Sequence, residues 1–194
     1  EKFLDGHPAA LMLGDNIFHG KDFYKKLKEA NESNNNTIFC IEVPDPERFG
    51  ICELDKNQRV ISLEEKPIIP KSKLAVTGLY FYDSNAAEYA KKVKRSVRGE
   101  LEITDLNIMY MKQNNLFAQA LYEDFIWIDA GTVNSFLDAG NIVKKIQTQN
   151  QEKISCLEKI AFESGFISAK QVTMLAKKYP KGEYSEYIEK LVKQ

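Results

Sequence analysis

The first forty residues alternate between strand-like and helix-like patterns, and this alternation constrains the fold more than any other feature. A continuous apolar run over residues 9–13, closed by Gly14, is typical of a strand buried on both faces. Apolar side chains then recur on one face of a helix expected over 22–33, and the run 37–43 predicts a second strand. A strand–helix–strand order predicts an α/β fold whose helices cover a mixed, mostly parallel sheet.

Strand and helix patterns continue to alternate up to about residue 150, and only helical patterns follow. Thr104 and Thr132 each precede a stretch with helical periodicity, where a short hydroxyl side chain predicts an N-cap. We expect one domain over 1–150 and a helical C-terminal segment over 151–194. The other expected strands are 51–54, 59–63, 74–82, 116–121 and 125–128; helices are expected from 83, 104 and 132, and around 157–162, 169–178 and 184–192.

Composition excludes several classes of partner. The chain carries 27 Lys and Arg against 28 Asp and Glu, so it has no electrostatic footprint for nucleic acid. No apolar run approaches the roughly 20 residues that cross a bilayer. Cys40, Cys52 and Cys156 lack a CxxC pair, which favours buried free thiols over a zinc site or a disulfide framework. We therefore expect a cytoplasmic protein without membrane or nucleic-acid partners.

Two aspartates stand at the ends of predicted strands. Asp15 directly follows the first apolar strand and a glycine, and Asp129 ends the apolar run before Thr132. Ligands of open α/β sheets bind beyond the carboxyl ends of the strands, so both acids are candidates to hold Mg²⁺ with substrate phosphates. The alternative is that each acid only caps the turn or helix that follows it.

Two further segments combine acidic and basic residues near strand and helix ends. Glu65 and Lys66 close a strand before a proline, and a carboxylate with an ammonium suits sugar hydroxyls and phosphate. Arg98 and Glu100 precede the helix expected from residue 104. The alternatives are a solvated strand end and an acidic helix N-terminus favoured by the helix dipole.

Six segments together resemble the glucose-1-phosphate thymidylyltransferase family, in order and in spacing. Each segment is a weak signal by itself, whereas the ordered set is specific. The resemblance covers essentially the whole chain and implies the nucleotide-diphospho-sugar transferase (Rossmann-like) type of sheet. The segments are LGDNIF (13–18), DPERFG (45–50), ISLEEKP (61–67), AVTGLYFYD (75–83), RGELEITD (98–105) and WIDAGT (127–132).

The resemblance also implies roles for individual residues. Asp15, Lys66 and Asp129 match catalytic positions, and the two aspartates match the acids that hold the catalytic Mg²⁺. Lys66 and Arg98 match basic residues on the sugar phosphate and the transferred phosphate. Ala130 stands where the family more often has Thr. The positions that match the glucose 1-phosphate pocket are Gly50, Glu65 and Val76, with Asn16, Tyr80, Glu100 and Trp127 as further candidates.

The implied reaction joins dTTP and glucose 1-phosphate to give dTDP-glucose and pyrophosphate, as in dTDP-rhamnose and cell-surface polysaccharide synthesis. The sugar phosphate is already largely ionised near pH 7, because its second pKa is about 6, so no general base is expected. The family also implies a homo-oligomer, as a tetramer. The alternatives are a sibling enzyme that uses CTP or UTP, and a catalytically silent sugar-phosphate-binding or regulatory module.

The family's opening strand and Gly-rich loop, which grip the nucleoside triphosphate, have no counterpart in this sequence. The chain starts at Glu1, a few residues before the first strand. We therefore expect it to correspond to the latter two thirds of the enzyme and to be incomplete for activity by itself. We also expect the strand at 9–13 to have an open edge.

Overall fold

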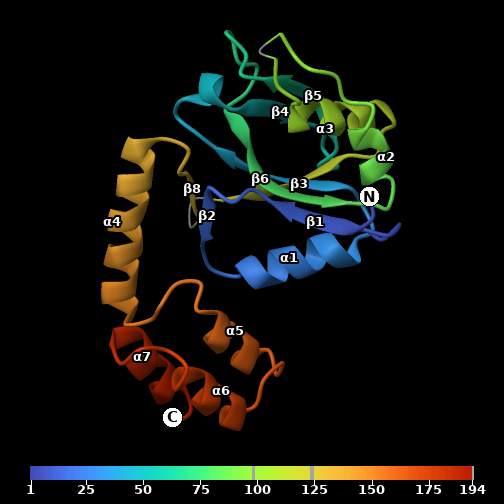
Figure 1. Cartoon of the computed structure of the whole chain (residues 1–194). Helices are drawn as coiled ribbons and strands as arrows, with labels where there is room; N and C mark the ends of the chain where they lie inside the picture. Colours follow the sequence, from blue (N-terminus) through green and yellow to red (C-terminus); the bar gives the residue numbers. More distant parts are fainter. Residues whose placement is uncertain (98, 123–124, 194) are drawn as a thin grey trace. The chain divides into compact units, whose positions relative to one another are not determined.

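The computed structural model describes residues 1–97, 99–122 and 125–193 (Figure 1). These residues form two compact units, 1–137 and 138–194. The change from one unit to the other falls within helix α4 (Val133–Asn150).

The first unit combines a sheet with helices, as the alternating patterns predict. The strand β2 and the short 3₁₀ helix η1 are additions that the sequence patterns did not indicate. The elements are β1 (Ala9–Met12), β2 (Asn16–His19), α1 (Phe23–Glu32), β3 (Thr37–Glu42), η1 (Pro46–Arg48), β4 (Gly50–Leu54), β5 (Val60–Glu65), β6 (Leu74–Tyr82), α2 (Ala86–Ala90), α3 (Ile103–Lys112), β7 (Phe117–Leu121) and β8 (Ile126–Asp129).

The main sheet is mixed, which confirms the predicted α/β class. Its strands lie in the order β5-β4-β6-β3-β7, with β1 beside β6. Strands β1, β3, β4 and β7 run in one direction, and β5 and β6 run in the other. Because β6 separates most of the co-directed strands, β3 and β7 form the one parallel pairing among the described strands of this sheet. Strands β2 and β8 form a separate antiparallel pair.

Helices cover both faces of the main sheet, so its central strands are buried on both sides. Ile38 and Cys40 of β3 face a core with α2 and α3, whereas Phe39 faces a core with α1. Figure 1 shows α1 on one side of the sheet and α2 and α3 on the other. The alternation of neighbouring side chains between two cores follows from the two-residue period of a strand.

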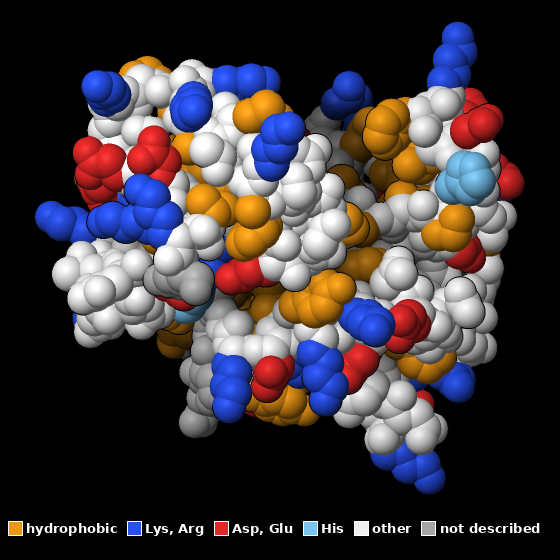
Figure 2. All heavy atoms as spheres, turned by 90° about the horizontal axis from the view of Figure 1, so that it is seen from below, with side chains coloured by type: hydrophobic (Ala, Val, Ile, Leu, Met, Phe, Trp, Pro, Cys, Tyr) orange, Lys and Arg blue, Asp and Glu red, His pale blue; other side chains and the backbone are white. Residues whose placement is uncertain are grey.

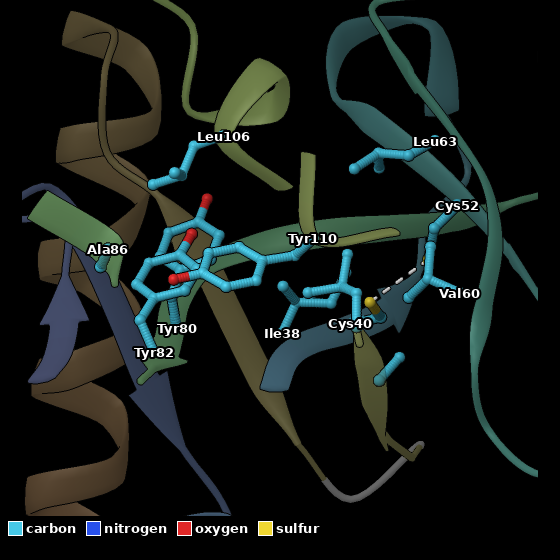
Figure 3. Packing of buried hydrophobic residues seen from close by; sticks show 12 residues of the cluster. Ile38, Cys40, Cys52, Val60, Leu63, Tyr80, Tyr82, Ala86, Leu106 and Tyr110 are labelled. Carbon is cyan, nitrogen blue, oxygen red and sulfur yellow. Dashed lines mark hydrogen bonds between the residues drawn. The ribbon is translucent and has the colours of Figure 1, made fainter. Parts of the chain in front are cut away.

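A stack of tyrosines fills the core beneath α2 and α3. The Tyr80 and Tyr82 rings lie 5.8 Å apart between centroids, and Tyr82 and Tyr110 lie 5.6 Å apart (Figure 3). Burial raises the pKa of the Tyr80 and Tyr82 hydroxyls, so both stay protonated. The Tyr82 hydroxyl donates to Asn107 Oδ1 at 2.7 Å, which satisfies this buried polar group.

The three cysteines are free and buried, as predicted. Cys40 Sγ and Cys52 Sγ lie 3.4 Å apart in the same core (Figure 3). Burial raises the pKa of the Cys40 thiol, which favours the protonated form.

The predicted burial of the first strand on both faces is wrong. Strand β1 forms at the expected place, but it pairs only with β6 among the described strands. Leu11 is 39% exposed and Met12 is 52% exposed. None of the buried clusters of the described residues includes a β1 side chain, so the apolar side chains of β1 face solvent. The expected open edge of β1 is confirmed, because β6 is its one partner among the described strands.

The second unit is helical, as predicted, with α5 (Leu157–Glu163), α6 (Ala169–Ala176) and α7 (Glu183–Leu191). The buried carboxylate of Glu158 lies beside its small apolar core, which includes Tyr184. Tyr179 and Tyr184 donate hydrogen bonds to Glu158 at 2.5 and 2.6 Å. Burial raises the pKa of Glu158, but these bonds outweigh it, and the net pKa lies below its ordinary value.

The described helices include none that is both long and apolar enough to span a bilayer. Figure 2 shows basic and acidic side chains interspersed on the face in view. This mixture matches the formal net charge of −1.

Candidate active site

A cavity of about 200 Å³ in the first unit brings most of the predicted site residues together. Strands β2, β4, β5, β6 and β8 and the start of α3 contribute to its walls. A larger cavity of about 450 Å³ lies in the second unit and contains none of the predicted residues. The predicted residues that line the smaller cavity are Asp15, Asn16, Gly50, Glu65, Lys66, Val76, Tyr80, Trp127 and Asp129.

Asp15 and Asp129 converge because β2 and β8 pair. Asn16 lies opposite Asp129 in the register, and the Ala130 amide donates to the Asp15 carbonyl oxygen at 2.8 Å. A Cβ added to Gly131 would lie 3.2 Å from Asp129 Oδ1 and 3.6 Å from Asp15 Oδ2. Both carboxylates therefore flank one point, and the glycine keeps that point free of a side chain.

The chemistry of this acid pair suits Mg²⁺. The ion is commonly bound by one or two carboxylates, with water and substrate phosphates as the remaining ligands. One oxygen of each acid already accepts a hydrogen bond: Asp15 Oδ1 from Asn16 Nδ2 at 2.9 Å, and Asp129 Oδ1 from the Gly131 amide at 3.2 Å. Among the described residues, no cluster of three or more His, Cys, Asp or Glu side chains could enclose a metal. The pair therefore fits an ion that shares its ligands with a substrate.

Glu65, at the end of β5, is held from α3. The Thr104 hydroxyl donates to Glu65 Oε2 at 2.5 Å, and Thr104 is buried. A Cβ added to Gly50 would lie 3.2 Å from Glu65 Oε2, so the glycine allows the carboxylate to approach β4 closely. The predicted N-cap role of Thr104 is wrong, because the N-cap position of α3 is Glu102.

Two cationic side chains line the cavity beside Glu65. Lys66 has a left-handed backbone with φ of 44°, and its amide donates to the Phe49 carbonyl oxygen at 3.0 Å. A residue other than glycine rarely adopts this conformation, so the surrounding structure, including the bond to Phe49, must stabilise the turn. Arg48 was not predicted; its guanidinium lies 5.2 Å from the Phe49 ring centroid and pairs with Asp45.

Asn16 and Trp127 form the wall between the acids and the sheet. The Trp127 indole donates to Asn16 Oδ1 at 2.7 Å, and its ring lies 5.0 Å from the Phe49 ring between centroids. Tyr80 is buried and also lines this cavity.

Two predicted residues are not placed in this cavity. Glu100 is exposed and does not line it. Arg98 lies outside the described residues. Conversely, Thr104 and Gly78 line the cavity although the sequence analysis gave neither a site role, and only their position inside the matched motifs pointed to them.

Comparison with known proteins finds relatives over nearly the whole chain. Residues 1–146 match the model of the nucleotidyl transferase family. A glucose-1-phosphate thymidylyltransferase from Neisseria meningitidis is 44% identical over 195 residues, which cover 100% of this chain and 68% of that protein. One from Xanthomonas campestris is 43% identical over 193 residues, which cover 99% of this chain and 65% of that protein. The chain thus spans about two thirds of the length of these curated relatives.

Solved structures share the fold. A Bacillus anthracis structure assigned as a glucose-1-phosphate thymidylyltransferase, in complex with sucrose, superimposes with a TM-score of 0.62 at 39% identity. That match covers 73% of this chain and 56% of the other. An apo UDP-glucose pyrophosphorylase gives a TM-score of 0.68 at 20% identity, over 76% of this chain and 57% of the other, and shows the fold alone. The chain belongs to the glucose-1-phosphate thymidylyltransferase family of nucleotidyl transferases.

Proposed function

We propose that this protein transfers a thymidylyl group from dTTP to glucose 1-phosphate and releases pyrophosphate. The observation that carries the proposal is the convergence of Asp15 and Asp129 in the cavity that also holds Glu65. One cavity thus offers a place for phosphates and a carboxylate for sugar hydroxyls. The names of the relatives, which match over nearly the whole chain, support the same reaction.

The reacting group on the sugar needs no base from the protein. Its phosphate has a second pKa of about 6, so a phosphate oxygen is a ready nucleophile near pH 7. This oxygen forms a bond to the α-phosphorus of dTTP as the bond from that phosphorus to the bridging oxygen of the β-phosphate breaks, and pyrophosphate leaves. The task of the protein is therefore to bring two anions together and to orient them.

The side chains of the cavity suit this task. Glu65, oriented by Thr104, accepts hydrogen bonds from sugar hydroxyls. The Lys66 ammonium offsets the negative charge of the incoming phosphate. Asp15 and Asp129 hold Mg²⁺, which when bound neutralises phosphate charge in the transition state.

Pyrophosphate release tests the proposal directly. The intact protein is used, because residues 1–194 alone are expected to be incomplete for activity. It is incubated with glucose 1-phosphate, Mg²⁺ and either dTTP, CTP or UTP, and we expect turnover with dTTP above the other two. Preference for CTP or UTP would assign a sibling activity. Binding of glucose 1-phosphate without turnover of any triphosphate would favour a silent binding module and contradict the proposal.

A substitution of Asp129 tests the metal-binding role of the acid pair. Asp129→Asn should abolish turnover while circular dichroism stays unchanged, because a lost metal ligand removes several kcal/mol of transition-state stabilisation. Asp138→Asn, at an exposed position of α4, is the matched control and should retain activity. Near-normal turnover of Asp129→Asn at limiting Mg²⁺ would contradict the assignment.

The pathway and the assembly follow from the resemblance alone. Synthesis of dTDP-rhamnose and cell-surface polysaccharide, a cytoplasmic location and a tetrameric state stay predictions.

A further inference from the structure

Asn16 joins three parts of the cavity through one buried side chain. It is 7% exposed, and its Nδ2 donates to Asp15 Oδ1 at 2.9 Å. Its Oδ1 accepts from the Gly78 amide of β6 at 3.0 Å and from Trp127 Nε1 of β8 at 2.7 Å. A single amide group thus connects one metal-binding acid, the main sheet and the indole wall.

The hydrogen-bond partners fix the direction of this amide. An amide oxygen has two lone pairs, and two N–H donors face Asn16 Oδ1. In the reversed orientation the NH₂ group would face these two donors, and the oxygen would face the Asp15 carboxylate. Because both changes are unfavourable, the network leaves one orientation, in which Asn16 donates to Asp15.

This donation selects which oxygen of Asp15 faces the other acid. Asp15 Oδ1 is tied to Asn16, whereas Oδ2 lies near the point beside Gly131 that Asp129 Oδ1 also approaches. Strand β6 of the main sheet also packs tightly against the Asn16 side chain. A Cβ added to Gly78 would lie 2.7 Å from Asn16 Oδ1, so glycine is required for this close approach.

We propose that Asn16 is a positioning residue that holds the Asp15 carboxylate and the Trp127 indole in their reactive arrangement. The sequence analysis treated Asn16 as a substrate-binding candidate, and this role differs from direct contact with the sugar. The proposal rests on the proposed function for its effect on turnover. Groups that orient the ligands of a metal typically contribute 10- to 100-fold to metal affinity or activity.

The test replaces Asn16 by Ala in the intact protein. We expect kcat to fall about 10- to 100-fold while KM for glucose 1-phosphate stays near the wild-type value. Calorimetric titration with Mg²⁺ should show weaker binding by a similar factor. Trp127 is the one tryptophan of this sequence, so its emission reports on the indole directly, with Trp127→Phe as the blank. Without any ligand, the emission of Asn16→Ala should shift to longer wavelength as water replaces the amide.

Asn36 provides a matched control with the same chemistry away from the cavity. It is buried, accepts from the Asp83 amide at 2.8 Å and donates to Asp83 Oδ2 at 3.3 Å. Asn36→Ala should lower the free energy of unfolding but leave kcat, Mg²⁺ binding and Trp127 emission unchanged. Equal behaviour of the two variants would reduce Asn16 to a structural role and overturn the proposal.

Other outcomes are also decisive. A raised KM with unchanged kcat in Asn16→Ala would identify a direct sugar ligand instead. If the wild-type protein released no pyrophosphate, the proposed function would fail, whereas Mg²⁺ binding and Trp127 emission would still decide the role of Asn16. Unchanged Mg²⁺ binding and emission in Asn16→Ala would overturn that role.

Discussion

The Thr104 hydroxyl donates a hydrogen bond to Glu65 Oε2 across 2.5 Å, so a residue in the first turn of α3 orients a carboxylate at the end of β5. Both side chains line the cavity that contains the acid pair. The bond crosses 39 positions of the chain, and it fixes the group that we propose for sugar recognition.

Replacing Thr104 by Val should weaken the binding of glucose 1-phosphate. Valine keeps the shape but removes the hydroxyl that orients Glu65, so this side chain must be ordered when the sugar binds. Ordering one side chain costs about 0.5–1.5 kcal/mol, or up to about tenfold in affinity. Calorimetry with glucose 1-phosphate and with dTTP measures both affinities. Thr104→Ser keeps the hydroxyl and should bind nearly as the wild type does. An equal loss for both ligands, or for both variants, would argue against this role of Thr104.

Replacing Gly78 by Ala should reduce both stability and turnover. The added Cβ would lie 2.7 Å from Asn16 Oδ1, and three hydrogen bonds prevent Asn16 from moving aside without loss. Overpacking at a buried site typically costs about 1–3 kcal/mol. Gly140→Ala is the matched control, since Gly140 is exposed in α4 and a Cβ there meets no atom within 4 Å. Thermal unfolding should show a loss for Gly78→Ala and a slight gain for Gly140→Ala; similar shifts would contradict the packing argument.

The order of helices and strands could be predicted because local patterns determine it. Strand β6 was predicted with its observed bounds, since β-branched and aromatic residues fill it. The N-cap role of Thr132 is confirmed, because its hydroxyl accepts from the Ser135 amide at 3.1 Å. The open edge of β1 was expected, but the exposure of its faces could not be predicted, because an apolar run gives the composition of a strand and not the elements that cover its faces.

The site was predictable only in part. Asp15 and Asp129 stand at strand ends, where the fold class itself places ligands. The role of Thr104 depends on how closely α3 approaches β5, and that of Gly78 on the position of Asn16; both are tertiary relationships. A threonine before a stretch with helical periodicity is also typical of an N-cap, and for Thr104 this local pattern led to the wrong prediction.

Replacing Glu158 by Gln should lower the stability of the helical unit in a pH-dependent way. Burial raises the pKa of Glu158, yet the bonds from Tyr179 and Tyr184 hold this pKa below its ordinary value. A lowered pKa stabilises the folded state above the unfolded pKa, and this stabilisation is lost as the pH falls through the folded pKa. Denaturant unfolding at pH 7 should show a loss of about 1–2 kcal/mol for Glu158→Gln, which shrinks below about pH 4.5. Glu189→Gln, at an exposed position of α7, should show little change at either pH; a loss for Glu158→Gln that does not depend on pH would contradict the charge argument.

The edge strand β1 leads to a prediction about self-association of residues 1–194 expressed alone. The edge of β1 away from β6 has no partner among the described strands, and the strand exposes Leu11 and Met12. An exposed apolar edge is a template for pairing with another chain, because its N–H and C=O groups lack partners. We expect this polypeptide to associate as its concentration rises, as measured by sedimentation or light scattering.

A charge placed on the β1 edge distinguishes association through strand pairing from nonspecific hydrophobic association. Met12→Lys places an ammonium on β1, and lysine on an edge strand opposes pairing, so the variant should stay monomeric at higher concentration than the wild type. Tyr24→Lys is the matched control: Tyr24 is 74% exposed, but it lies on α1, which offers no strand edge. Because both variants add the same charge, net repulsion between chains rises equally in both. A monomeric wild-type polypeptide, or an equal effect of the two lysines, would show that β1 does not drive association.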